Sequence, residues 1–245
     1  MAAPTNKQQL LDKTLTLLKK KFHPPAEPDK RPVLEEVVFA MCREGLPTAT
    51  ADAAFDRLRR AFVDWNEIRV SSVPEVAEVL GDTPQAGDRA KRIVEFLQEH
   101  FERTYSFELD DLEKKGVKQA AKQLARYKDK GVTDFTVAWV TQRALGGHAV
   151  PLDEPSIRVL RRLHVIEGDI DDLESTRASL EHHVSKANGY DFTEVLIDLG
   201  TTICVAVPLC RECPLSRDCP TGIENLARQG KKPTTAVAED KPKKK

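Results

Sequence analysis

The chain has 245 residues, of which 40% are hydrophobic and 31% charged, and its formal net charge is −1. This is ordinary for a globular protein of one or two domains with a sizeable core. It excludes a membrane span, since no apolar run approaches the ~20 residues that a span needs. The near-zero net charge also means that any affinity for nucleic acid must come from local basic patches.

Hydrophobic residues recur at helical spacing along most of the sequence, and no segment shows the alternation typical of a strand. The sequence therefore predicts an all-α fold. We expect Gly116 to end one helix and Gly146 with Gly147 to stop another. The predicted helices cover residues 7–21, 32–41, 51–63, 72–80, 88–101, 117–127, 135–145, 153–163, 171–184 and 191–203.

Two helix starts carry recognisable capping signals. Ser72, followed three residues later by Glu75, has the spacing of a capping box. Asp153, with Pro155 two residues on, has the pattern of an N-cap residue. Cys42 stands alone in an apolar helix and is expected to be a small core residue.

Four of the five cysteines lie within sixteen residues, in the spacing C-x5-C-x2-C-x5-C. Four thiolates this close in sequence are a ligand set for a metal ion or an iron–sulfur cluster. Two disulfides are the alternative, but charged residues interrupt the N-terminal segment, so no signal peptide is expected there and a secreted disulfide pair is disfavoured. Spacing alone leaves structural zinc and a [4Fe–4S] cluster open. The proposed ligands are Cys204, Cys210, Cys213 and Cys219.

A basic stretch precedes a glycine-containing turn. Lys118, Lys122 and Arg126 recur every fourth position, so on a helix each step drifts by only about 40° and the three share a face. The stripe leads into the turn at Gly131, whose backbone N–H groups could bind a phosphate. A solvated helix face is the alternative, although this face lacks the interleaved carboxylates that would neutralise it.

The order of these features resembles the endonuclease III branch of the helix-hairpin-helix (HhH-GPD) DNA glycosylases. The resemblance covers residues 30–222 and is most specific from Gly200 to Cys219 and from Gly131 to Arg158. It implies a two-lobed all-α fold with a DNA cleft between the lobes, and it favours a [4Fe–4S] cluster over zinc. The implied parts are an N-terminal helix joining the cluster lobe (1–31), a six-helix domain with the hairpin (32–150), the cluster lobe (151–225) and a disordered basic tail (226–245).

The chain departs from the family pattern at the hairpin. Family hairpins usually read L-P-G-V-G, followed two residues on by a catalytic lysine. Here Gly131 is kept, Thr133 replaces the second glycine, and Phe135 occupies the lysine position. A phenyl ring cannot form a Schiff base with a sugar. The resemblance therefore implies a monofunctional glycosylase without lyase activity.

Asp153 matches the catalytic aspartate of the family, where a carboxylate could stabilise positive charge on the sugar or orient a water molecule. Its alternative role is only that of an N-cap. Arg158 falls where the family also has arginine. The intercalating glutamine of the family falls near Glu44, and the acidic residue of the adenine-mismatch branch falls near Phe39. The first cysteine gap is five residues, where the family usually has six.

The leading hypothesis is a DNA glycosylase that flips a damaged or mismatched base into a pocket near Phe135, Trp139 and Asp153. Its partner would be double-stranded DNA; we expect an intracellular monomer, cytoplasmic or nucleoid-associated, without membrane association. One alternative is a non-catalytic iron–sulfur DNA-binding protein of the same fold, and another is an interaction protein with a structural zinc. The residues expected at the DNA are Lys118, Lys122, Arg126, Lys130, Gly131, Val132 and Thr133.

Overall fold

The computed structural model describes residues 7–166 and 173–230. Within these ranges the chain forms twelve α-helices, two short 3₁₀ helices and no strand, which confirms the predicted all-α class. No helix in these ranges combines the length and the hydrophobicity that a membrane span requires. The elements are α1 (Lys7–Phe22), α2 (Val33–Arg43), α3 (Thr48–Ala61), α4 (Trp65–Val70), α5 (Val73–Leu80), α6 (Ala86–Thr104), η1 (Asp110–Leu112), α7 (Val117–Leu124), η2 (Ala125–Lys130), α8 (Asp134–Arg143), α9 (Glu154–Arg162), α10 (Leu173–His183), α11 (Lys186–Thr202) and α12 (Pro220–Gly230).

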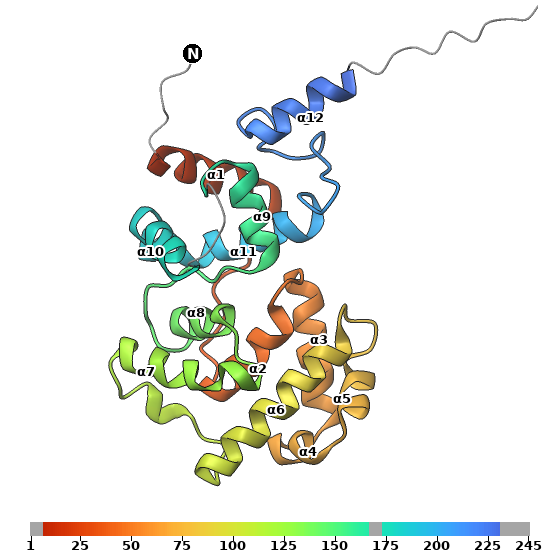
Figure 1. Cartoon of the computed structure of the whole chain (residues 1–245), viewed down its shortest axis with the longest axis vertical. Helices are drawn as coiled ribbons and strands as arrows, with labels where there is room; N and C mark the ends of the chain where they lie inside the picture. Colours follow the sequence, from red (N-terminus) through yellow and green to blue (C-terminus); the bar gives the residue numbers. More distant parts are fainter. Residues whose placement is uncertain (1–6, 167–172, 231–245) are drawn as a thin grey trace, which may run out of the picture.

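The buried hydrophobic side chains form two clusters, and the helices around each cluster define a lobe. The first lobe contains α2 to α8, with Ile197 of α11 also packed into its cluster. The second lobe contains α1 and α9 to α11, with Leu215 of the cysteine loop in its cluster, and α12 packs on α9. Figure 1 shows the first lobe below and the second above. Because α1 belongs to the second lobe, residues 23–32 cross from one lobe to the other.

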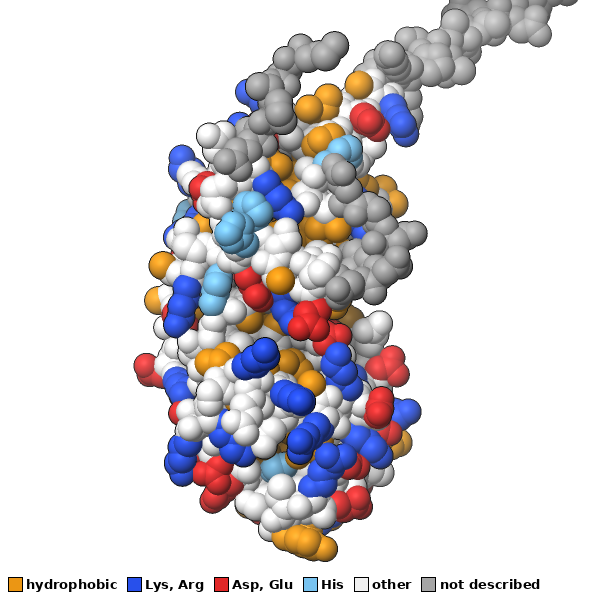
Figure 2. Space-filling view, turned by 60° about the vertical axis from the view of Figure 1, so that its left-hand side comes forward, with side chains coloured by type: hydrophobic (Ala, Val, Ile, Leu, Met, Phe, Trp, Pro, Cys, Tyr) orange, Lys and Arg blue, Asp and Glu red, His pale blue; other side chains and the backbone are white. Residues whose placement is uncertain are grey.

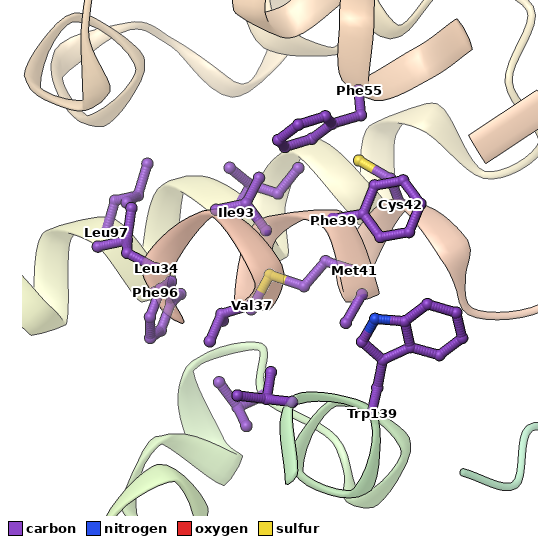
Figure 3. Close-up of a cluster of buried hydrophobic side chains, with 14 of the residues drawn as sticks. Leu34, Val37, Phe39, Met41, Cys42, Phe55, Ile93, Phe96, Leu97 and Trp139 are labelled. Carbon is purple, nitrogen blue, oxygen red and sulfur yellow. The ribbon is translucent and has the colours of Figure 1, made fainter. Parts of the chain in front are cut away.

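Helix α2 lies at the centre of the first lobe. All of its residues except Glu35 are buried, and it packs against α3, α6 and α8. Figure 3 shows Phe39 of α2 between Phe55 of α3 and Trp139 of α8, with ring centroids 5.5 Å and 5.9 Å away. Each such side chain contributes about 1.5–3 kcal/mol through burial. Cys42 is fully buried, which confirms it as a core residue, and burial raises the pKa of its thiol to about 12.

Both predicted helix caps are present. Ser72 and Glu75 form a reciprocal capping box, in which the Glu75 carboxylate accepts from the Ser72 N–H at 2.7 Å. Asp153 caps α9 by accepting from the N–H of Ser156 at 2.8 Å. Caps of this kind contribute about 1 kcal/mol each. These two local signals therefore start helices at the predicted residues.

The segment around 117–127 differs from its prediction. The α-helical winding ends at Leu124 and continues as the tighter η2, and Gly116 precedes α7 as its N-cap and does not end a helix. The change accompanies the burial of Tyr127, whose ring lies 5.3 Å from Phe96 and whose hydroxyl lies 3.0 Å from Nδ1 of His100. Tertiary packing thus overrides a continuous helical pattern.

Three short elements were not predicted. Helix α4 has a single buried residue, Ile68, and η1 is one turn long, so neither shows a hydrophobic period in the sequence. Helix α12 extends over residues 226–230, which the sequence assigned to the tail. The remainder of that tail, like residues 1–6 and the predicted helix start at 171–172, lies outside the described residues.

Candidate functional site

Asp153 lies where the two lobes meet. Its side chain is buried, with Oδ1 accepting from the Ser156 N–H at 2.8 Å and Oδ2 accepting from the Gly45 N–H at 3.0 Å. The first bond caps α9 of the second lobe, and the other reaches the α2–α3 loop of the first. Each carboxylate oxygen retains a lone pair for a further donor. Asp153 lines a hollow together with Glu44 and Arg92 of the first lobe.

The predicted hairpin turn connects η2 to α8. Gly131 has φ +92°, and a Cβ at this position would lie 2.6 Å from the carbonyl oxygen of Arg92, so only glycine fits. The N–H groups of Gly131 and Val132 both donate to the carbonyl of Tyr127, so neither is free for a phosphate. Thr133 is the N-cap of α8 and accepts from the Thr136 N–H at 3.2 Å.

Glu44 joins the hairpin to the loop that contacts Asp153. Its Oε2 accepts from the Thr133 hydroxyl at 3.0 Å and from Nη2 of Arg92 at 2.6 Å. Arg92 also donates through Nε to the carbonyl of Gly131 at 2.9 Å. The Glu44 carboxylate is therefore paired with Arg92 and held against the turn.

The predicted DNA-contacting cations lie on one side of the first lobe. Lys118, Lys122 and Arg126 are exposed and form no ion pair within the described residues, whereas Lys130 lies 3.5 Å from Glu99. Arg126 belongs to the 3₁₀ helix η2, so its direction relative to Lys118 and Lys122 differs from that expected on a continuous α-helix. Figure 2, which brings forward the side of the molecule where α7 lies, shows many basic side chains in its lower half.

The two predicted pocket aromatics are both core residues. Phe135 and Trp139 are each 2% exposed, and their ring centroids lie 5.5 Å apart. Trp139 lines a pocket between the lobes, while Phe135 is not among the residues of its wall. Asp153 lines a separate hollow, whose wall also includes residues 44–46. The structure therefore does not bring the three predicted residues together in one pocket.

The pocket between the lobes is partly open to solvent. Its wall is built from the 25–31 crossing segment and from helices α2, α3, α8 and α11, so both lobes contribute. Aromatic and charged side chains both line it. The lining side chains include Arg31, Glu36, Phe39, Arg43, Thr48, Asp52, Trp139, Arg143, Tyr190 and Glu194.

Glu194 is the centre of a buried charge network in this pocket. It accepts from Arg143 at 2.6 Å, from Arg43 at 3.1 Å and from the hydroxyl of Thr48 at 2.8 Å. Burial acts to raise the pKa of Glu194, but the two guanidinium groups and the Thr48 bond outweigh it, so the pKa lies below its ordinary value. Removing one member of a buried network like this costs about 3–5 kcal/mol.

Arg143 is held in the pocket wall by two aromatic rings. Its guanidinium carbon lies 3.8 Å from the ring centroid of Tyr190 and 4.5 Å from that of Trp139. Nη2 is used by Glu194, but Nε and Nη1 are buried without a protein acceptor, and so is Nε of Arg43. A buried N–H donor without an acceptor destabilises the folded protein, so such groups are rare.

The four predicted ligand cysteines line one small pocket. N–H donors lie near three of the sulfurs: Arg162 is 3.3 Å from Cys204 Sγ, the Gly222 N–H 3.4 Å from Cys219 Sγ, and Asn225 3.5 Å from Cys210 Sγ. Among the described residues, however, no three His, Cys, Asp or Glu side chains are close enough to hold one metal ion.

Burial raises the pKa of Cys213 to about 11, and the neighbouring cysteines add to the shift. Burial likewise raises the pKa of Cys219. The Cys213 and Cys219 thiols would therefore have to release their protons to the solvent when a metal binds.

Arg158, which the resemblance aligned with a family arginine, has a structural role on α9. It donates to the carbonyl of Cys204 at 2.9 Å and to that of Gly200 at 2.8 Å. The helices approach closely here, because a Cβ on Gly200 would lie 2.7 Å from Pro155. Arg158 thus fastens α9 to the start of the cysteine loop.

Sequence reasoning missed the residues that build the inter-lobe pocket. Arg43, Arg143 and Glu194 are each separated by at least 50 residues from the next, so no local motif joins them. One sequence signal could have indicated buried charges here. Arg43 and Arg143 end largely apolar helices, and Glu194 lies on the apolar face of α11. A buried charge requires a partner, and these three residues are partners of one another.

Known proteins resemble this chain in structure but not in sequence. No family model matches the sequence, and no curated protein matches it. Among solved structures, a trapped covalent intermediate of endonuclease III with DNA has a TM-score of 0.67 at 20% identity, covering 91% of this chain and 99% of that chain.

A thermostable thymine-DNA glycosylase has a TM-score of 0.59 at 20% identity, covering 89% of this chain and 97% of that chain. The H. pylori 3-methyladenine DNA glycosylase (MagIII) bound to 1,N6-ethenoadenine has a TM-score of 0.59 at 16% identity, with coverages of 80% and 97%. This chain therefore has the fold of endonuclease III and of these DNA glycosylases.

Proposed function

We propose that this protein is a monofunctional DNA glycosylase of base-excision repair. The observation that carries the proposal is the inter-lobe pocket, which lies beside the loop that binds Asp153 in a fold shared with DNA glycosylases. A base must leave the duplex stack before its glycosidic bond can be attacked. The pocket lies between the lobes, and the flipped base would enter it there.

The flipped base would be accommodated among Phe39, Trp139 and Tyr190 of the pocket wall. Stacking of a base on an aromatic ring contributes about 1–3 kcal/mol, which offsets much of the cost of unstacking it from DNA. Trp139 is held in place because its Nε1 donates to Glu36 at 2.6 Å. Its ring is therefore a fixed, almost fully buried part of the pocket wall, and Tyr190 is the least buried of the three rings.

Asp153 would stabilise positive charge on the sugar and orient the attacking water. Its two backbone hydrogen bonds hold the carboxylate in one position without consuming all of its lone pairs. Phe135 offers no amine, so the proposed nucleophile is water. Lys30 does line the pocket, but its ammonium lies 2.6 Å from Glu113, outside the pocket wall.

The cysteine pocket would hold a [4Fe–4S] cluster through Cys204, Cys210, Cys213 and Cys219. A single zinc ion has Zn–S bonds of about 2.3 Å, so it needs four sulfurs close together. A cluster spreads its four thiolates over four iron atoms, which suits sulfurs that share a pocket but are farther apart. The N–H groups beside three sulfurs are the kind of second shell that stabilises thiolate ligands.

Iron, sulfide and zinc analysis of anaerobically purified protein tests the cofactor. We expect four iron and four sulfide per chain, in line with the [4Fe–4S] assignment. The corresponding Cys213→Ser variant should lose the visible absorbance. One zinc per chain without iron would contradict the cluster and support a structural zinc site.

The activity test uses duplexes that contain uracil, alkylated purines, oxidised pyrimidines or mismatches, treated with hot alkali after incubation. We expect strand breaks only after alkali, and no protein–DNA adduct on borohydride reduction. Asp153→Asn should abolish base release while the fold is retained, because asparagine also caps helices well. Asp64→Asn, at the N-cap of α4, is the matched control. Full activity of Asp153→Asn would refute the assigned role.

The non-catalytic alternative rests on one observation. The N–H groups of Gly131 and Val132 are already bonded to Tyr127, and Glu44 is fixed beside the turn, so this hairpin presents fewer donors to DNA than the sequence suggested. Salt-dependent duplex binding with no base release from cofactor-loaded protein would establish that alternative.

A further inference from the structure

Arg162 joins the end of α9 to the first part of the cysteine loop. Its Nη1 donates to the carbonyls of Cys204 at 3.1 Å and Val205 at 2.7 Å. Its Nη2 donates to the carbonyl of Ala206 at 2.9 Å. Three consecutive carbonyl groups therefore converge on one guanidinium. Their dipoles repel one another unless a cation lies among them, and a planar cation with several fixed donors suits this arrangement.

The same residue contacts the sulfur atoms of the first and the last cysteine of the loop. Nη1 lies 3.3 Å from Sγ of Cys204, and the Cys219 thiol donates to the carbonyl oxygen of Arg162 at 3.1 Å. Arg162 is the last residue of α9, and the final carbonyls of a helix have no acceptor role within it. The side chain and the backbone of Arg162 thus link Cys204 to Cys219.

The chain between the first two cysteines has few other contacts to hold it. Residues 205–209, all of them described, are exposed or only partly buried, and they form no helix. One backbone hydrogen bond closes this segment, from the Leu209 N–H to the Ile203 carbonyl at 2.9 Å. A segment with so few buried contacts opens easily. The bonds from Arg162 therefore fasten this segment to α9.

We propose that Arg162 is a positioning residue that shapes the cysteine pocket and thereby controls how firmly the pocket retains its metal. Its N–H beside Sγ of Cys204 is the kind of outer-shell donor that orients a metal ligand. Metal binding removes the S–H proton of Cys219 but leaves the guanidinium bonds to the carbonyls, so these bonds hold the loop with and without metal. This inference rests on the cofactor site of the proposed function, and it applies to iron and to zinc alike.

The test measures the rate at which anaerobically purified protein releases its iron or zinc to an excess of chelator. Arg162→Gln should release metal at least tenfold faster than wild type, because glutamine has no charge and a single amide donor group. Tenfold corresponds to about 1.4 kcal/mol, close to the net contribution of one hydrogen bond. Arg162→Lys keeps the charge but loses the planar donors, so its rate should lie between the two.

Arg161→Gln is the matched control. Arg161 precedes Arg162 on α9, is exposed, and forms no side-chain hydrogen bond or ion pair in the described residues. The substitution removes the same charge and should leave metal release unchanged. If Arg162→Gln does not fold by thermal denaturation, Arg162→Lys is compared with wild type in its place.

The outcomes separate this inference from the cofactor proposal. Release from Arg162→Gln within twofold of wild type, or full rescue by Arg162→Lys, overturns the inference and leaves the cofactor proposal intact. If wild-type protein contains neither iron nor zinc, the cofactor proposal fails, and hydrogen exchange of the Leu209 amide in the metal-free protein decides whether Arg162 positions the loop. Exchange at least tenfold faster in Arg162→Gln, with Arg161→Gln unchanged, supports that role; equal exchange overturns it.

Discussion

The Oε2 atom of Glu44 lies 3.0 Å from the hydroxyl oxygen of Thr133, and this contact fixes the α2–α3 loop to the turn that begins α8. The neighbouring Gly45 donates to Asp153. The hairpin, the loop and the proposed catalytic carboxylate are consequently joined by consecutive hydrogen bonds. Glu44 therefore acts as a brace between the α2–α3 loop and the turn.

Glu44→Gln should strengthen DNA binding. The change removes a negative charge beside the hairpin and leaves Arg92 with an uncompensated positive charge, while glutamine still accepts from Thr133. We expect affinity for undamaged duplex to rise severalfold at low salt, with a loss of stability below about 1 kcal/mol, since the pair is partly exposed. Fluorescence anisotropy over a salt series measures this; weaker binding would show that the carboxylate contacts DNA productively.

Neutralising Lys118 and Lys122 should weaken duplex binding. Both are exposed on α7 without a carboxylate partner in the described residues. If each contacts one phosphate, the double glutamine variant should reduce the slope of log K against log salt concentration by about 1.8. Lys91→Gln is the control, because Lys91 already lies 3.8 Å from Glu95 on α6. An unchanged slope would identify the stripe as a solvated face.

Phe135→Lys should destabilise the protein and not create a lyase. The ring is 2% exposed in the core of the first lobe, so the change loses its packing and buries an amine. We expect a loss of about 3 kcal/mol or more in urea denaturation, against about 1 kcal/mol for Phe135→Leu. A stable Phe135→Lys protein that is trapped on DNA by borohydride would place this position within reach of the sugar.

Local signals in the sequence predicted the long helices and their caps. The apolar period of residues 7–21, the capping box at Ser72 and the N-cap at Asp153 each depend on residues within one or two turns, which the sequence displays directly. The six-residue helix α4 was missed because so short a helix with one buried side chain leaves no measurable period. Helix α12 has 11 residues, but its second half fell in the segment that the sequence assigned to the tail.

The walls of the candidate site could not be predicted in the same way. Arg43, Arg143 and Glu194 meet only because α11 of the second lobe packs against α2 and α8 of the first. That packing is a tertiary relationship between segments 51 and 151 residues apart, and no local pattern encodes it. Phe135 illustrates the reverse error, because its position in a family motif suggested a pocket wall, whereas the fold buries it in the core.

The charge network at Glu194 should make stability depend on acid pH. Its pKa lies below the ordinary value in the folded protein, because the guanidinium groups of Arg43 and Arg143 outweigh the opposing effect of burial. The unfolded chain, with a glutamate pKa of about 4.3, therefore takes up a proton first as the pH falls. The stabilisation from Glu194 is complete well above pH 4.3 and is lost as the pH falls through the folded pKa.

Glu194→Gln should lower the free energy of unfolding by about 3–5 kcal/mol at pH 7 and reduce its decline toward pH 3. Asp198→Asn is the control: Asp198 lies 3.6 Å from Arg43, but burial raises its pKa, so its contribution has the opposite sign. That variant should keep the acid decline caused by Glu194. Urea denaturation at pH 7, 5, 4 and 3 measures both. Parallel pH profiles for wild type and Glu194→Gln would show that Glu194 does not hold its charge in the folded protein.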